Sequence, residues 1–252
     1  MNYHKNKALF LFTSIVAFLS AYSDLPGQKN GKIHFQNFDG FTNKEYADYL
    51  ADEGWPADFI NTAAEAEYLT EDEKNVVLTM NLIRFDPAKY AEFYVYPIIQ
   101  YFDGKLLRLP GRTPLRTVEG SDAVKELYLE LLETQSRDLF YPSQGMSKAA
   151  NDHARYMKRT GKASHEGRGD MNTRISKYGQ WDGGISENLH WGASNAHDAV
   201  LSLMTDDGIK NRGHRKIILD PDYTYVGVAI DKHPRYNISY VIKYAVMFTE
   251  KQ

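Results

Sequence analysis

The stretch from His165 to Arg215 constrains this chain more than any other part of the sequence. It contains Ser-His-Glu-Gly at 164–167, Ser-Glu-Asn-Leu at 186–189 and Asp-Asp-Gly-Ile-Lys-Asn-Arg-Gly-His-Arg at 206–215. Histidine and acidic side chains recur here beside glycine and other turn-forming residues. Polar groups that bind metals or move protons are often carried on loops that a rigid scaffold holds in place. The stretch therefore predicts a functional site assembled from separate loops.

The composition excludes several classes of protein. A chain of 252 residues can form one or two domains with a core of useful size. The formal net charge of −3 gives no basic footprint for nucleic acid, so no nucleic-acid partner is expected. There is no cysteine, which excludes disulfides, a thiolate nucleophile and cysteine-ligated zinc. Packing alone must hold the fold.

The N-terminus has the pattern of a secretory signal peptide. Lys5 and Lys7 precede the almost entirely apolar run Ala8–Leu19, and small residues follow at the positions that a signal peptidase reads. We expect residues 1–23 to be removed and the protein to be secreted or periplasmic. The apolar run is shorter than the roughly 20 residues of a membrane span, so the mature chain should have none. An uncleaved anchor or a buried N-terminal helix is the alternative interpretation.

Residues 24–69 form a leader with little periodicity. Thr42 and Glu45 have the spacing of a capping box and predict a short helix, which Gly-Trp-Pro at 54–56 would end. The leader either packs locally on the following domain or stays partly mobile.

Residues 70–252 are predicted to form the main domain, beginning with a long helix. Thr70 and Glu73 form a second capping box, and the apolar stripe that follows also carries Arg84. The helix should end before Pro87, because a residue that precedes proline avoids the helical region. Further helices are predicted at 87–93, 121–132, 147–160, 172–178 and 197–204.

Two strands are predicted near the C-terminus. Tyr225–Ile230 alternates in hydrophobicity, and Ile238–Thr249 is rich in β-branched and aromatic residues. The short connection between them favours an antiparallel hairpin. Helices followed by antiparallel strands indicate an α+β layered domain rather than a parallel sheet.

The order and spacing of the motifs resemble those of the CAP superfamily, also called the SCP domain. This superfamily includes cysteine-rich secretory proteins, venom antigen 5 and plant pathogenesis-related proteins. The resemblance is to a bacterial, cysteine-free branch, and it covers Thr70–Thr249. It is carried by Ala-Ala-x-x-His-Ala at 149–154, Ser-His-Glu-Gly at 164–167, Arg174 before Tyr178-Gly179, Ser-Glu-Asn-Leu at 186–189, Asp-Asp-Gly at 206–208, Arg-Gly-His-Arg at 212–215 and Val-Gly-Val at 226–228. It implies an α-β-α sandwich with a central three- or four-stranded antiparallel sheet. It also implies a cleft with two histidines and two acidic residues.

The resemblance assigns the site residues one at a time. His165 and His214 match the two family histidines, and Glu187 matches the first family glutamate. The second acid departs from the pattern, because aspartate stands where animal and plant members have glutamate. Asp206 is the better candidate for this position and Asp207 the alternative.

The residue types alone indicate what such a cleft can do. Two neutral imidazoles, here His165 and His214, suit Zn²⁺ or another divalent cation, with carboxylates as ligands, orienting groups or bases. Asn188 and Arg215 complete the predicted ligand-binding set, which also holds Glu187 and Asp206. Hydrogen bonds from the histidines to loop backbone, and an ion pair from Arg215 to a nearby aspartate, are the alternatives.

Two functions remain open from the sequence. The first is a secreted, monomeric binding module for a small molecule, a lipid, a glycan or cell-wall fragment, or a peptide. The second is a hydrolase in which His165, Glu187 and His214 activate water for peptide or ester cleavage. No serine lies in a Gly-x-Ser-x-Gly turn, so an enzyme would depend on metal or general-base chemistry.

Overall fold

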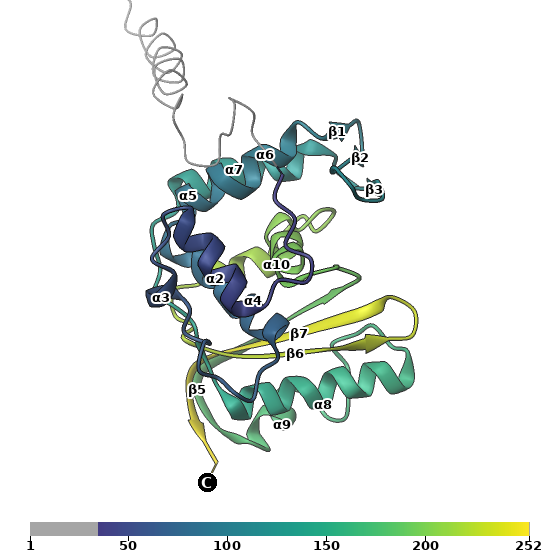
Figure 1. Ribbon diagram of the computed structural model, residues 1–252. Helices are drawn as coiled ribbons and strands as arrows, with labels where there is room; N and C mark the ends of the chain where they lie inside the picture. The colour runs from purple at the N-terminus through teal and green to yellow at the C-terminus, as the bar shows by residue number, and fades with distance from the viewer. Residues whose placement is uncertain (1–34, 252) are drawn as a thin grey trace, which may run out of the picture. The chain divides into compact units, whose positions relative to one another are not determined.

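The computed structural model describes residues 35–251 (Figure 1). The predicted signal peptide, residues 1–23, and the first part of the leader, residues 24–34, lie outside the described residues. Between residues 35 and 251, no helix combines the length and the apolar character needed to cross a membrane.

A mixed sheet forms the centre of the fold. Its strands are β4 (Tyr141–Pro142), β5 (Gly179–Trp191), β6 (Tyr225–His233) and β7 (Asn237–Glu250), in the spatial order β4-β6-β7-β5. β6 and β7 form the predicted antiparallel hairpin, and β5 pairs with β7 in the antiparallel sense. The short β4 adds a parallel edge to β6. The structure thus confirms an α+β fold built on three long antiparallel strands.

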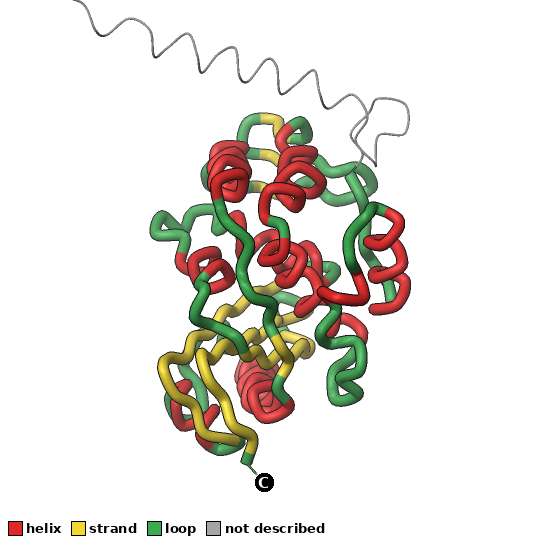
Figure 2. Tube along the Cα trace, turned by 90° about the vertical axis from the view of Figure 1, so that its left-hand side faces the viewer, coloured by secondary structure: helices red, strands yellow, loops and turns green. Residues whose placement is uncertain are grey.

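Helices cover both faces of the sheet, which gives the predicted α-β-α sandwich. α8 (Gln144–Thr160) and α9 (Met171–Ser176) lie on one face, and α4 (Glu71–Phe85) and α10 (Ala196–Thr205) lie on the other (Figure 1). Figure 2 shows the strand layer between these helical groups from the side. β5 is at the edge of the sheet, so loops from either face can reach it.

The sheet alternates its side chains between its two apolar faces, as the two-residue period of a strand requires. One cluster on the α8 face consists of Ala150, Ala154, Met157, Leu189, Ala229 and Val241, and a second contains Met146, Ala149, Ile175, Ala245 and Phe248. The opposite face contributes Val228, Ile242 and Tyr244 to the larger core that α4 and α10 share. α8 approaches β6 so closely that a Cβ at Gly227 would overlap the backbone of Met146. This contact explains the glycine of the Val-Gly-Val motif.

Local capping sets the ends of the first helices. Thr42 and Thr70 each accept a hydrogen bond in a complete capping box, so α2 (Asn43–Asp52) and α4 begin where predicted. α3 (Ala57–Ile60) follows Pro56, and both α2 and α3 pack on α4. Tyr46 and Leu50 of α2 are buried in the same core as the apolar side of α4.

The remaining elements connect the layers. They are α5 (Pro87–Tyr90), the π-helix η2 (Ala91–Val95), α6 (Tyr96–Ile99), β1 (Phe102–Asp103), β2 (Leu106–Leu107), β3 (Leu115–Arg116), α7 (Ser121–Glu133) and α11 (Gly213–Leu219). The three short strands form a separate antiparallel sheet. α7 and α11 matter for the site, because their polar side chains meet beside the histidine loop.

Two predictions of local structure were wrong. The segment that holds Ser-Glu-Asn-Leu is not a loop but β5, interrupted by an irregularity between Asp182 and Ile185. Its polar and glycine-rich sequence hides the alternation that normally reveals a strand. α8 begins at Gln144 rather than at Ser147, because Ser143 caps the helix by accepting a hydrogen bond from Met146 N–H.

Candidate functional site

The first part of the site is a pair formed by His165 and Glu187, here called the first dyad. His165 lies in the loop between α8 and α9, and Glu187 lies on β5. The His165 Nδ1 atom is 2.9 Å from Glu187 Oε1. The imidazole is 60% exposed, whereas the carboxylate is 3% exposed. A buried carboxylate therefore holds an exposed imidazole in a fixed orientation.

Two cationic side chains also bind the Glu187 carboxylate. Lys243 on the neighbouring β7 and Arg174 on α9 both donate to Glu187 Oε2, the latter at 3.3 Å. Burial alone would raise the pKa of Glu187, but the hydrogen bond from His165 and the charge of Lys243 lower it to about 2. Glu187 is therefore ionised at neutral pH and has both oxygens engaged.

Buried side chains of α8 and α9 hold the loop that carries His165 in place through hydrogen bonds to its backbone. Arg174 donates to the carbonyl oxygens of His165, at 3.2 Å, and Gly169, at 2.8 Å. His153 is fully buried, and its Nε2 lies 2.9 Å from Ser164 O. A Cβ at Gly167 would come within 2.8 Å of His153 Nδ1, so this close packing requires the glycine of Ser-His-Glu-Gly.

The second part of the site pairs His214 with Asp206, here called the second dyad. Asp206 Oδ1 lies 2.5 Å from His214 Nδ1, and Asp206 Oδ2 accepts from His214 N–H at 2.9 Å. Asp206 ends α10 in the left-handed conformation, with φ of 54°, and its carboxylate also serves the first turn of α11. One buried aspartate therefore sets both the backbone and the imidazole of His214.

Three glutamates hold the loop between α10 and α11 in position by binding its arginines. Arg212 donates to Glu119 and Glu126, and Arg215 donates to Glu126 and Glu130, at distances from 2.5 to 3.0 Å. Both arginines are buried, whereas the three glutamates are partly exposed. The side-chain partners of Arg215 are glutamates rather than the expected aspartates, and its assignment to the ligand-binding set stays a prediction.

The structure distinguishes the two candidates for the second acid, Asp206 and Asp207, by their contacts. Asp206 contacts His214, whereas Asp207 accepts the backbone N–H groups of Val118 and Glu119. Asp207 therefore fastens the neighbouring loop and touches neither imidazole. Asp206 is the acid that accompanies the second histidine.

Asn188 connects the two dyads through the edge strand. It follows Glu187 on β5, and its Nδ2 atom donates to His214 O at 3.2 Å and to Tyr244 Oη at 3.2 Å. Successive strand residues point to opposite faces, so Glu187 faces α8 while Asn188 faces α11. In the described residues, no hydrogen bond joins the imidazoles, and no three His, Asp or Glu side chains are grouped to hold a metal ion.

The sequence reasoning missed Lys243 and the glutamate cluster. Lys243 is the single charged residue in the run Ile238–Phe248, and a charge inside an apolar strand signals a buried partner. Its partner depends on the pairing of β5 with β7, where Glu187 stands opposite Lys243. The glutamates lie on and just before α7, about 85 to 95 positions from the arginines they bind, and show no motif.

The α-β-α sandwich agrees with the fold that the resemblance to the SCP domain implied. The profile of the cysteine-rich secretory protein family, CAP, matches residues 135–246. Residues 135–246 therefore resemble this family, and the lack of cysteine fits a cysteine-free branch. The match begins after α7, so α4 and the segments around it lie outside the matched part.

Two solved structures are similar to parts of the chain. An extracellular SCP-domain protein of Bacillus anthracis is 22% identical with a TM-score of 0.35, over 43% of this chain and 34% of that one. An outer surface protein of Borrelia burgdorferi is 18% identical with a TM-score of 0.36, over 52% of this chain and 94% of that one. The alignment thus spans about a third of the Bacillus protein. No curated protein matches the chain.

Proposed function

We propose that this protein is an exported CAP-domain binding module whose two dyads hold a divalent cation beside an extracellular ligand. The observation that carries the proposal is that each imidazole is fixed through Nδ1 by a buried carboxylate. Metal-binding histidines typically use one ring nitrogen for such a carboxylate and the other for the ion.

The residues present fit a loosely held ion rather than a structural metal centre. Neither His165 Nε2 nor His214 Nε2 has a hydrogen-bond partner in the part of the chain described here. Glu187 and Asp206 are committed to orienting their imidazoles, so the protein would supply two nitrogen ligands. Such a site leaves coordination positions open for water or a ligand group, and zinc accepts this donor type. β5 is an edge strand, so both loops can reach over it.

The hydrolase alternative has less support. Glu187 was the proposed partner for activating water, but its pKa of about 2 makes it a weak base. Its oxygens are already bonded to His165, Arg174 and Lys243. A binding module needs no group that exchanges protons, and it is the function that we favour. The ligand classes expected from the sequence, a lipid, a glycan or cell-wall fragment, or a peptide, carry over into this proposal.

Zinc binding tests the proposal directly. We expect calorimetry to detect one zinc ion per chain in the wild-type protein and none in a His165→Ala/His214→Ala variant. Because only neutral imidazoles bind metal, affinity should be lower at about pH 5.5 than at about pH 7.5. Undiminished zinc binding by the double variant would reject these two ligands.

A matched pair of aspartate variants separates orientation from folding. Asp206→Asn preserves size and tolerates the left-handed backbone, but it removes the charge that orients His214. We expect zinc affinity to fall about 10- to 100-fold in this variant. Asp207→Asn makes the same chemical change one residue later, away from both imidazoles, and should bind zinc like the wild type. Equal losses in the two variants would contradict a specific role for Asp206.

Export is the other part of the proposal, and it rests on the lysines and the apolar run at the N-terminus. We expect mass spectrometry of the native protein to find a chain that begins near Asp24, with no peptide from Ala8–Leu19. Recovery of most molecules with an intact N-terminus would instead favour the anchor or the buried helix.

A further inference from the structure

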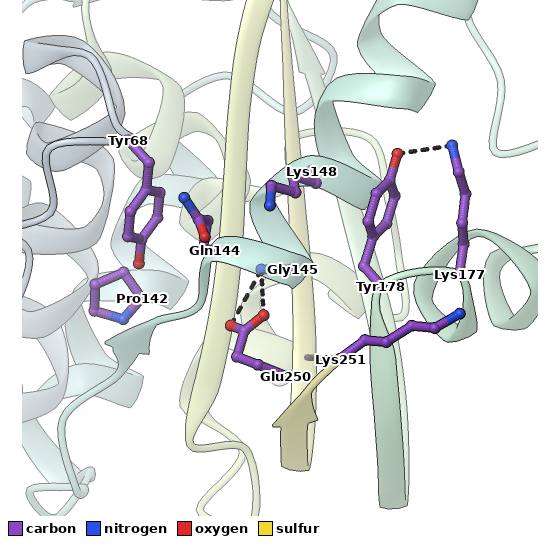
Figure 3. Close-up of a pocket in the computed structure, with 9 residues that line it drawn as sticks. All are labelled: Tyr68, Pro142, Gln144, Gly145, Lys148, Lys177, Tyr178, Glu250 and Lys251. Carbon is purple, nitrogen blue, oxygen red and sulfur yellow. Dashed lines mark hydrogen bonds between the residues drawn. The ribbon is translucent and has the colours of Figure 1, made fainter.

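A pocket of about 400 Å³ lies where the first turn of α8 meets the end of β7. Three lysines line it, namely Lys148 from α8, Lys177 after α9 and Lys251 after β7. Figure 3 shows Tyr68 on one side and Tyr178 on the other, with α8 between them. Neither dyad contributes a residue to this pocket, so it is separate from the site described above.

The pocket lining has an excess of positive charge. Lys148 and Lys251 form no ion pair with any residue between 35 and 251. Lys177 is 2.7 Å from Asp152 Oδ2 and 2.7 Å from Tyr178 Oη. Among the lining residues that the structure describes, Glu250 is the acidic one. Asp152 neutralises Lys177, so the two unpaired ammonium groups of Lys148 and Lys251 outnumber the one lining carboxylate, Glu250.

The carboxylate of Glu250 is already occupied. It accepts hydrogen bonds from Gly145 N–H, at 2.9 Å to Oε2, and from Ser143 Oγ, at 2.7 Å to Oε1. Backbone N–H groups in the first turn of α8 therefore already have hydrogen-bond acceptors within the chain. The attraction for an anion comes from the lysines, while Glu250 holds the floor of the pocket in place.

The two tyrosines give the pocket partly apolar walls with polar tips. Burial, and then the charge of Glu250, raise the pKa of Tyr68 to about 12, so its phenol is neutral at physiological pH. A neutral phenol packs against a ring and also donates a hydrogen bond. The cavity volume is at the lower end of the range for small-molecule sites, which is about 300–1,000 Å³. The occupant should therefore be small and ring-bearing.

We propose that this pocket binds a small acidic sugar-like molecule, in which one carboxylate or phosphate meets the lysines and a hydroxylated ring lies against the tyrosines. Lysine ammonium groups bind either oxyanion as point charges, so both groups share the chemistry that is recognised here. Tyr68 and the amide of Gln144 offer hydrogen bonds for ring hydroxyls, while the Tyr178 hydroxyl already donates to Asp152 and leaves its ring as an apolar wall.

Titration with three related probes tests this inference. Glucuronate carries a carboxylate, glucose 6-phosphate carries a phosphate, and glucose carries neither. We expect at least one of the two acids to bind the wild-type protein, as followed by calorimetry, and glucose to bind at least about tenfold more weakly. Preference for one acid identifies the group that the pocket recognises. Equal binding of glucose, or binding by neither acid, would overturn the proposal.

Lysine variants locate the binding in the pocket. Lys148→Ala/Lys251→Ala should weaken binding of the preferred acid about tenfold or more, whereas Lys148→Arg/Lys251→Arg keeps the charge and should retain most of it. Lys105→Ala/Lys232→Ala removes two exposed lysines elsewhere and should have no effect. The His165→Ala/His214→Ala variant should also bind normally, so failure of the zinc proposal would not affect this result. An unchanged affinity in Lys148→Ala/Lys251→Ala would overturn the assignment.

Discussion

Replacing Glu187 by alanine should lower the free energy of unfolding by about 3–5 kcal/mol, the usual cost of removing one partner from a buried ion pair. The substitution leaves Lys243, which is fully buried, and Arg174 without the carboxylate that neutralises them. It also removes the group that orients His165. Chemical denaturation monitored by circular dichroism measures the change.

Two further variants show whether unpaired charge is the cause. Glu187→Ala/Lys243→Met removes both members of the ion pair and fills the lysine volume with an apolar chain. It should be more stable than Glu187→Ala alone, because less uncompensated charge remains. Glu166→Ala removes an exposed glutamate from the same loop region and should change stability by less than about 0.5 kcal/mol. A Glu187→Ala protein as stable as the Glu166→Ala control would contradict the expected cost.

Acid should reproduce part of the effect in the wild-type protein. The pKa of Glu187 is about 2 in the folded state, below the ordinary value of 4.5. As the pH falls, Glu187 is therefore protonated at a higher pH in the unfolded chain than in the folded protein. The stability contributed by Glu187 is complete above about pH 4.5 and is lost as the pH approaches 2.

Local chemistry made parts of the fold predictable from the sequence. Thr42 and Thr70 cap their helices with side chains three residues away, so the signal lies within a few positions. The β6–β7 hairpin has a short connection and a strong apolar pattern. β5 was missed because its polar site residues, Glu187 and Asn188, interrupt the apolar pattern that a half-buried strand would show.

The site itself was only partly predictable. The motifs located His165, Glu187, Asp206 and His214, because their spacing resembles that of a known family. They did not show which acid accompanies which histidine, since that depends on the meeting of β5, α10 and the loops in space. The register of β5 against β7 decides that Lys243 stands opposite Glu187, and no local pattern encodes a register between strands separated by two helices and a third strand.

Replacing Arg84 should also lower the free energy of unfolding by a large amount. Its partners, like those of Glu187, lie far away in the sequence and could not be predicted from a local pattern. The sequence placed it on the apolar stripe of the first long helix, and the structure buries it completely. Its guanidinium lies 4.0 Å from the centre of the Phe140 ring. It donates to four backbone carbonyl groups that lie far away in the sequence, those of Asp138, Ile218, Asp220 and Tyr223.

These contacts join α4 to the segment before β4 and to the connection between α11 and β6. Burial lowers the pKa of Arg84 to about 10, yet the group remains charged at neutral pH. Methionine in its place would fill much of the volume but leave the four carbonyl groups without this donor. Each buried group left unsatisfied costs about 1–3 kcal/mol, and partial relaxation brings the expected total for Arg84→Met to about 3–5 kcal/mol.

Arg108→Met is the matched control, because it makes the same chemical change at an exposed arginine paired with exposed Asp103. Surface ion pairs of this kind contribute about 0–1 kcal/mol, so this variant should unfold almost like the wild type. Arg84→Lys should fall between the two, since an ammonium has three donors and lacks the planar fork that reaches four carbonyl groups. The order wild type, Arg84→Lys, Arg84→Met in decreasing denaturant midpoint would support the bonding role. An Arg84→Met protein as stable as the wild type would show that the carbonyl groups find other partners and that the guanidinium is dispensable.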